Sequence, residues 1–171
     1  MTYRSTTPNA IVTLDLVLAD PEATAQCGRA IAPMIEGGMV ITLSGALGSG
    51  KTTLVRALLR ARGVTGLVRS PSFTLVEHYP VSSLYFYHID LYRFAHPSEW
   101  ETSGLAECFR DDAVCLIDWP ERAEGRLPAP DLEIFLSYPE RGTGRRLRVV
   151  ATSGAGERCE CALRAAMTAH S

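Results

Sequence analysis

The sequence has no long apolar run. Nothing in its 171 residues approaches the roughly 20 apolar residues that a membrane-spanning helix needs. The first ten residues, MTYRSTTPNA, also lack the apolar stretch of a secretion signal. We therefore expect a soluble protein that acts in the cytoplasm and has no membrane partner.

A Cys-x-x-Cys pair is also absent, although the chain has five cysteines. This absence argues against a zinc site or a redox motif. An odd, irregularly spaced set in a cytoplasmic chain predicts reduced cysteines that pack in the core or lie on the surface. The cysteines are Cys27, Cys108, Cys115, Cys159 and Cys161.

The net charge is small, at −2, which argues against a broad surface for nucleic acid. The charge is nevertheless uneven, because no acidic residue occurs between Gly37 and Val76. This stretch either forms a solvated helix surface or provides a positive environment for a polyanion, and both can hold. Its cations are Lys51, Arg56, Arg60, Arg62 and Arg69.

One short segment carries a recognisable chemical pattern. Residues 45–52, GALGSGKT, match the phosphate-binding loop G-x-x-x-x-G-K-[ST]. Its glycines permit the tight curl that places backbone N–H groups around a polyphosphate. Lys51 is then expected to contact the β- and γ-phosphates, and the Thr52 hydroxyl to ligate Mg²⁺.

The alternative interpretation of this segment is a plain glycine-rich turn, and its surroundings argue against that. The apolar run Val40–Leu43 before it is typical of a strand buried on both faces. The residues after it place an apolar stripe at helical spacing, and Gly63 is a typical helix stop. A helix that begins near Lys51 would direct its free N–H groups at the same anion.

The remaining patterns predict an α/β fold in one domain, without repeats, low-complexity segments or linkers. Residues 1–9 are expected to be disordered, 10–153 to form the P-loop domain, and 154–171 to add a C-terminal helical tail to the same domain. The expected strands are 11–18, 72–79, 84–90, 113–117, 132–138 and 145–151. The expected helices are 20–35, which Pro33 can end early, 97–110, broken at Gly104, a short helix from Trp119, and 156–169.

Two aspartates follow predicted strands and are candidates for the chemistry beside a phosphate loop. Ligands bind at the carboxyl ends of strands in an open α/β sheet. The run before Asp118 is wholly apolar, as a central parallel strand should be, so we assign Asp118 to the metal, through a water. Asp90 is the candidate to orient the attacking water or to contact a second metal. The alternatives are a helix N-cap for Asp118, with Glu121 in a capping box, and a turn residue for Asp90.

Four basic residues are weaker candidates. His88 lies next to Asp90, but a lone histidine in a strand is more often packed than catalytic. Arg141, Arg145 and Arg146 flank a glycine-rich turn. They could reach a base or a phosphate, although a solvated hairpin tip is the simpler interpretation.

The chain resembles the TsaE (YjeE) family of small bacterial P-loop ATPases, which support threonylcarbamoyl modification of adenosine in tRNA. Four blocks carry the resemblance, within about residues 20–151. They are GALGSGKTT, SPSFTLVEHY (70–79), YHIDLYR (87–93) and IDWPER (117–122). The resemblance implies a single P-loop NTPase-like domain with a mixed central sheet flanked by helices.

The resemblance also implies roles for individual residues. Asp90 falls on an aspartate needed for ATP hydrolysis, acting with Lys51. Thr52 and Asp118 fall on magnesium positions, and Asp118 stands where the family usually has glutamate. Thr74 belongs to a switch-like loop near the γ-phosphate. Together with the loop pattern, the expected nucleotide-binding residues are Glu22, Gly45, Gly48, Ser49, Gly50, Lys51, Thr52 and Thr53.

The implied activity is a slow, Mg²⁺-dependent ATPase that acts on a complex of TsaD and TsaB and reaches tRNA only indirectly. Turnover is expected to be slow because no finger arginine is evident in the sequence. Two other classes stay open, a P-loop small-molecule kinase with residues 141–146 as its lid and a nucleotide switch that does not hydrolyse. The absence of an N-K-x-D motif favours ATP over GTP.

Overall fold

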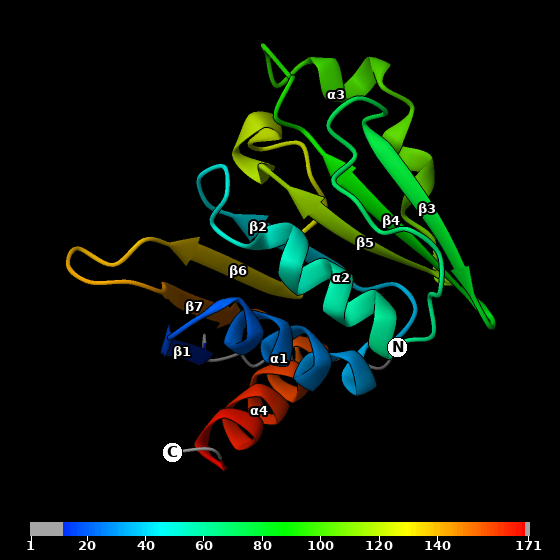
Figure 1. Cartoon of the computed structure of the whole chain (residues 1–171). Helices are drawn as coiled ribbons and strands as arrows, with labels where there is room; N and C mark the ends of the chain where they lie inside the picture. Colours follow the sequence, from blue (N-terminus) through cyan, green and yellow to red (C-terminus); the bar gives the residue numbers. More distant parts are fainter. Residues whose placement is uncertain (1–11, 170–171) are drawn as a thin grey trace, which may run out of the picture.

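The computed structural model describes residues 12–169, so the disorder expected for residues 1–9 lies outside it. One seven-stranded sheet runs through the molecule in the order β1-β7-β6-β2-β5-β4-β3 (Figure 1). The strands are β1 Val12–Leu18, β2 Val40–Ser44, β3 Val76–Val81, β4 Leu84–Asp90, β5 Ala113–Asp118, β6 Leu132–Ser137 and β7 Arg145–Ala151. The α-helices are α1 Pro21–Ile31, α2 Lys51–Ala61, α3 Glu99–Thr102 and α4 Gly154–Thr168, and the 3₁₀ helices are η1 Ala32–Met34, η2 Leu105–Cys108 and η3 Pro120–Ala123.

The sheet is mixed, which confirms the predicted fold class. Strands β4, β5, β2 and β6 are parallel, while β3, β7 and β1 pair antiparallel with their neighbours. All six residues of β5 are buried, as its apolar run predicts for a central strand. The carboxyl ends of β2, β4 and β5 therefore meet at one edge of the sheet.

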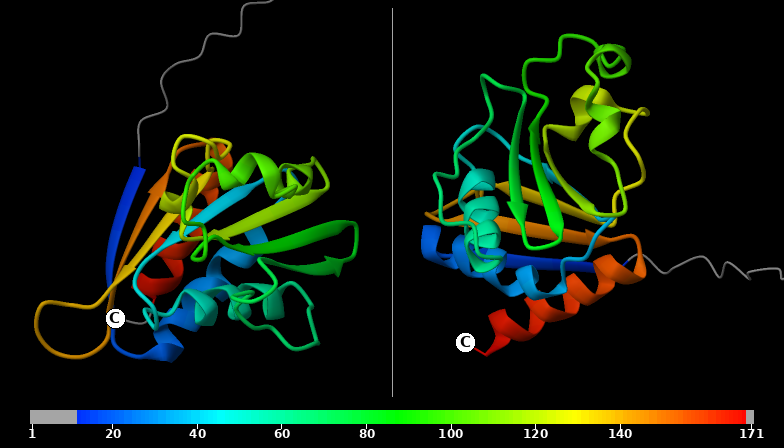
Figure 2. Two further views of the ribbon diagram at one scale, coloured as in Figure 1. Left: turned by 90° about the horizontal axis from the view of Figure 1, so that it is seen from above. Right: turned by 90° about the vertical axis from the view of Figure 1, so that its right-hand side faces the viewer.

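Helices cover both faces of the sheet. Helices α1, α2 and α4 lie on one face, where α1 packs against both α2 and α4, and α4 also contacts β7 (Figure 2). Successive residues of β5 alternate between the two faces. Leu116 belongs to the larger core with α1 and α2, whereas Ile117 belongs to a smaller core with Trp100 of α3. Burial of such side chains is worth about 1.5–3 kcal/mol each, which fixes the register of the strand.

Several predicted boundaries agree with the structure. Asp20 caps α1 by accepting from the Ala23 N–H at 2.8 Å, and the α-helix ends before Pro33, where η1 continues. The predicted β6–β7 and β3–β4 hairpins both form. The C-terminal helix begins at Gly154, two residues before the predicted start, with Ser153 as its N-cap.

Two local predictions are wrong. The strand expected over 72–79 begins only at Val76, because Leu75 adopts φ +67° and its carbonyl accepts from the Asp90 N–H. The capping box at Asp118 does not form either. Asp118 is the last residue of β5, and the short 3₁₀ helix η3 starts after Trp119 without a side-chain cap. No helix within residues 12–169 is both long enough and apolar enough to cross a bilayer.

Candidate nucleotide-binding site

Residues 45–50 join the end of β2 to the start of α2, and their conformation requires glycine. Gly48 and Gly50 have φ of +76° and +112°, a region that side chains with a Cβ rarely adopt. A Cβ on Gly45 would lie 2.3 Å from the Leu136 carbonyl oxygen of β6. The loop therefore turns as tightly as the phosphate-binding pattern predicts, and it does so against the neighbouring strand.

Every carbonyl of residues 45–49 accepts a hydrogen bond. The Lys51 Nζ donates to the carbonyls of Gly45 at 2.5 Å and Ala46 at 3.2 Å. The Tyr138 hydroxyl donates to the Leu47 carbonyl at 3.4 Å. The Arg145 guanidinium spans the next two carbonyls, those of Gly48 and Ser49, at 3.1 Å each. The acceptors of the loop are thus occupied by side chains.

The donors of the loop are in the opposite situation. Among residues 12–169, the backbone N–H groups of Gly48, Gly50 and Lys51 have no protein acceptor. They lie where the N-terminal end of α2 concentrates a partial positive charge. A loop with satisfied carbonyls and free N–H groups is suited to an anion with several oxygens.

A cavity of about 400 Å³ lies against this loop. Lys51, Thr52, Asp90 and Asp118 all line it, so the structure brings together the predicted phosphate, metal and hydrolysis residues. The Lys51 Nζ also lies over the Trp119 ring, 4.7 Å from its centroid. The cavity is lined by Leu47, Gly48, Gly50, Lys51, Thr52, Thr53, Ser70, Ser72, Asp90, Tyr92, Arg93, Asp118 and Trp119.

Lys51 is the only lysine of the sequence, and as a residue it is buried. Burial lowers the pKa of Lys51, and the nearby carboxylates of Asp118, Asp90 and Glu121 oppose this shift. The ammonium group has given up much of its water for carbonyl oxygens and a ring face. A phosphate oxygen offers a fully charged acceptor in their place.

The two aspartates stand directly opposite each other on adjacent parallel strands. Asp90 is fixed by two donors, the Tyr92 N–H at 2.9 Å and the Ser70 hydroxyl at 3.1 Å. Asp118 has one partner among the described residues, the His88 Nε2 at 3.1 Å from its Oδ2. The two carboxylates make one side of the cavity negative. The phosphate loop with Lys51 lines the same cavity.

The donor set fits a magnesium ion. The Asp118 Oδ1 is buried and has no hydrogen-bond partner within residues 12–169, which is costly for a carboxylate oxygen unless a ligand or water meets it. The Thr52 side chain lines the same cavity. Carboxylate and hydroxyl oxygens beside phosphates are the ligands that Mg²⁺ takes in nucleotide sites.

A second cavity of about 320 Å³ adjoins the first across the start of α2. It shares Gly48, Gly50 and Thr53 with the first cavity, and it also contains Ser49. Its other walls come from the β1–α1 connection and from the β6–β7 hairpin. They include Ala19, Asp20, Pro21, Thr24, Thr143, Gly144 and Arg145.

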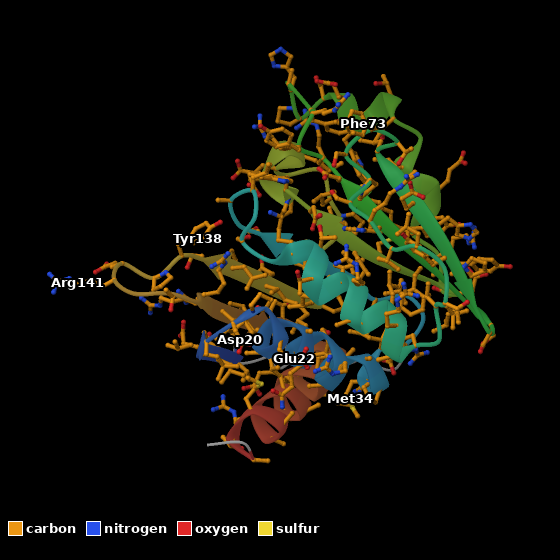
Figure 3. All side chains as sticks on the ribbon, in the orientation of Figure 1. Asp20, Glu22, Met34, Phe73, Tyr138 and Arg141 are labelled. Carbon is orange, nitrogen blue, oxygen red and sulfur yellow. The ribbon has the colours of Figure 1, made fainter. Side chains whose placement is uncertain are left out.

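Glu22 and Thr74 lie apart from both cavities. Glu22 lines neither of them and pairs with Arg29 on the exposed side of α1 (Figure 3). Thr74 donates to Glu77 at 3.1 Å, and Ser70 and Ser72 line the larger cavity instead. The nucleotide contact of Glu22 and the position of Thr74 near the γ-phosphate therefore stay predictions.

The β6–β7 hairpin contributes more than its sequence indicates. Arg141 lies at the hairpin tip and points away from the body of the protein, as a solvated tip would (Figure 3). Arg145 instead reaches the phosphate loop and stacks on Tyr138, 4.2 Å from the ring centroid. Nothing in the local sequence distinguishes the two arginines, because the loop lies almost a hundred residues away in the chain.

The fold and this loop define a P-loop nucleotide-binding protein. The family model described as "Threonylcarbamoyl adenosine biosynthesis protein TsaE" matches residues 18–147. The chain therefore belongs to the TsaE family, whose members take part in threonylcarbamoyladenosine biosynthesis in tRNA.

Individual relatives agree with this assignment. A TsaE protein of Haemophilus influenzae is 39% identical over 122 residues, which cover 71% of this chain and 76% of the relative. A TsaE protein of Bacillus subtilis is 35% identical over 141 residues, covering 82% and 85%. The crystal structure of YdiB from Bacillus subtilis superposes with a TM-score of 0.74 at 28% identity, over 95% of this chain and 99% of that one.

Proposed function

We propose that this protein is a magnesium-dependent ATPase that supports threonylcarbamoyladenosine formation in tRNA by acting on a complex of TsaB and TsaD. The family name supports the pathway, and the site supports the chemistry. The observation that carries the proposal is the loop whose carbonyls are all occupied while N–H groups at the start of α2 stay free. The two adjoining cavities suit a nucleotide, with its phosphates in the larger and its nucleoside in the smaller.

Different residues carry phosphate binding, metal binding and water activation in this proposal. Free N–H groups and Lys51 bind the β- and γ-phosphates and offset their charge. Thr52 and Asp118 would hold Mg²⁺, which neutralises negative charge on the phosphates when bound. Asp90, which accepts hydrogen bonds from Tyr92 and Ser70, would orient a water for attack on the γ-phosphorus. Water attack breaks the bond between this phosphorus and the bridging oxygen, which leaves with ADP, and the proton of the water passes to Asp90 or to phosphate.

An in-chain cation lies near this chemistry. Arg93 lines the larger cavity, and its guanidinium stacks on the ring of the exposed Phe73 at 4.8 Å. No finger arginine is evident in the sequence. We propose Arg93 for that role because it lines the larger cavity. Because Phe73 is 88% exposed, the loop that carries it is open to a protein partner that could complete the site.

The decisive experiment measures phosphate release from Mg·ATP with and without the TsaB–TsaD complex. We expect slow release by the parent, acceleration by the complex, and loss of release in Lys51→Ala and Asp90→Asn. Asp15→Asn, a change at an exposed carboxylate of β1, is the control and should behave as the parent does. Release by both site variants at the parental rate would refute the assignment.

Product analysis separates the alternatives. Equimolar ADP and phosphate support an ATPase, a phosphorylated acceptor would indicate a small-molecule kinase, and tight ATP binding without turnover in the presence of the complex would indicate a switch. Depletion of the protein in its host should lower threonylcarbamoyladenosine in tRNA. Unchanged modification after depletion would contradict the proposed pathway for this chain. We propose that the protein acts in the cytoplasm.

A further inference from the structure

His88 is a buried polar residue to which the proposed chemistry gives no task. It lies in the middle of β4 and is fully buried. Strand alternation puts it on the same face as Phe86 and Asp90, the face that α2 covers. Its only described polar partner is Asp118 on the neighbouring strand, at 3.1 Å.

One polar atom of His88 and one of Asp118 lack a hydrogen-bond partner among residues 12–169. The Nδ1 of His88 and the Oδ1 of Asp118 are both buried and have no partner within the described residues. The Nε2 must donate to the Asp118 Oδ2, because a carboxylate accepts. A hydrogen on Nδ1 would then be a buried donor without an acceptor, whereas a bare Nδ1 costs less. The geometry therefore selects the tautomer with its hydrogen on Nε2.

This bond determines which oxygen of Asp118 is free. A carboxylate at a strand end can rotate about its last bond, and either oxygen could turn towards His88. With Oδ2 held by the imidazole, Oδ1 is the oxygen that has no hydrogen-bond partner within residues 12–169, and Asp118 lines the larger cavity. The Lys51 ammonium group donates to the Gly45 and Ala46 carbonyls, and no hydrogen bond joins it to Asp118 in the described part of the chain.

We propose that His88 is a positioning residue that holds the Asp118 carboxylate so that Oδ1 is presented to the divalent cation of a bound nucleotide. This inference rests on the proposed function, since it needs a nucleotide with its metal in the larger cavity. A merely packed histidine would stabilise the sheet alike with and without the metal. A positioning histidine affects the metal-dependent part of nucleotide binding.

The test measures ADP affinity by calorimetry in EDTA and in Mg²⁺, and takes the ratio as the magnesium gain. We expect His88→Leu to bind ADP like the parent in EDTA but to lose about 10- to 100-fold of the magnesium gain, as is typical when a partner of a metal ligand is removed. His88→Gln, whose amide nitrogen can replace Nε2 as donor, should recover most of it. His78→Leu, at an exposed histidine of β3, is the control.

A double variant guards against a general folding defect. In an Asp118→Asn background, His88→Leu should change the magnesium gain no further. If His88→Leu lowers EDTA affinity, magnesium affinity and the unfolding midpoint together, or if it keeps the gain, the role of His88 is refuted. A parent that gains nothing from Mg²⁺ would instead refute the proposed function itself.

A spectroscopic readout applies even where the variant fails to fold. The ¹⁵N shifts of the His88 ring in the parent should show hydrogen on Nε2 and a bare Nδ1. Addition of Mn²⁺ with ADP should broaden these signals, since the pair adjoins the metal. A ring with its hydrogen on Nδ1 would overturn the inference.

Discussion

At the scale of single residues, Lys51 lies between the phosphate loop and the two aspartates of the site. Its Nζ lies against the loop carbonyls and over Trp119, close to both aspartates. Because the sequence has no other lysine, Lys51 carries its only side-chain amine, and burial lowers the pKa of that amine.

Lys51 labelling gives a direct test of where phosphate binds. We expect an amine-reactive reagent to modify Lys51 about tenfold more slowly when Mg·ATP is present at ten times its dissociation constant. Peptide mass spectrometry measures this, with the α-amino group as the internal control. Equal labelling of Lys51 with and without a bound nucleotide would contradict the assigned contact.

Gly45 tests the close approach between the loop and β6. In Gly45→Ala, the new methyl group would meet the Leu136 carbonyl, so we expect a loss of unfolding free energy of about 1–3 kcal/mol. Urea unfolding followed by circular dichroism measures it. Gly66→Ala is a matched control because that site has open space around it and no positive φ. Equal stabilities of the two variants would mean that the approach is not tight.

At the scale of elements, the β6–β7 hairpin supports the phosphate loop. Arg145 bonds two loop carbonyls and stacks on Tyr138, which bonds a third. The loop is therefore held in its curled form by an element that follows it by almost a hundred residues.

Removal of the Arg145 side chain should loosen the loop. Hydrogen bonds from a charged donor are worth about 1.5–3 kcal/mol, so we expect Arg145→Ala to weaken ADP binding about 10- to 100-fold. Hydrogen exchange in residues 45–50 should speed up as well. Arg148→Ala, at an exposed arginine of the same strand, should leave both unchanged. An Arg145 variant with normal affinity and exchange would show that the hairpin does not support the loop.

These elements also show what the sequence could predict. The strand–loop–helix unit and the apolar run of β5 before Asp118 have strong local signals, and the predicted residues Lys51, Thr52 and Asp118 line one cavity. Residues 72–75 were predicted to begin a strand but form a turn, because the Leu75 carbonyl accepts a hydrogen bond from the Asp90 N–H. The contact of Arg145 with the loop and the bond of His88 to Asp118 depend on tertiary packing, which no local pattern encodes.

At the scale of the whole molecule, buried thiols link stability to pH. Burial raises the pKa of Cys27 from 9.0 to about 12, and that of Cys115 to about 12. The unfolded chain loses these protons near pH 9, while the folded protein keeps them. The free energy of unfolding should therefore fall as the pH rises from about 9 towards 12.

Urea midpoints between pH 8.5 and 10.5 measure this dependence. Cys27→Ala should flatten the decrease, because one buried thiol no longer titrates, whereas Cys161→Ala, at an exposed position, should leave the slope as it is. The absolute midpoint of Cys27→Ala will also fall, so that the slope is the relevant quantity. A parental slope in Cys27→Ala would rule out Cys27 as a source of the pH dependence.

The central claim is that a loop with occupied carbonyls and free N–H groups binds the phosphates of a nucleotide. Calorimetric titration of the intact protein with Mg·ATP tests it most directly. We predict one site per chain, with affinity at least about tenfold lower in Lys51→Ala, because a charged hydrogen bond is lost. Absence of binding by the parent, or equal binding by Lys51→Ala, would contradict the account.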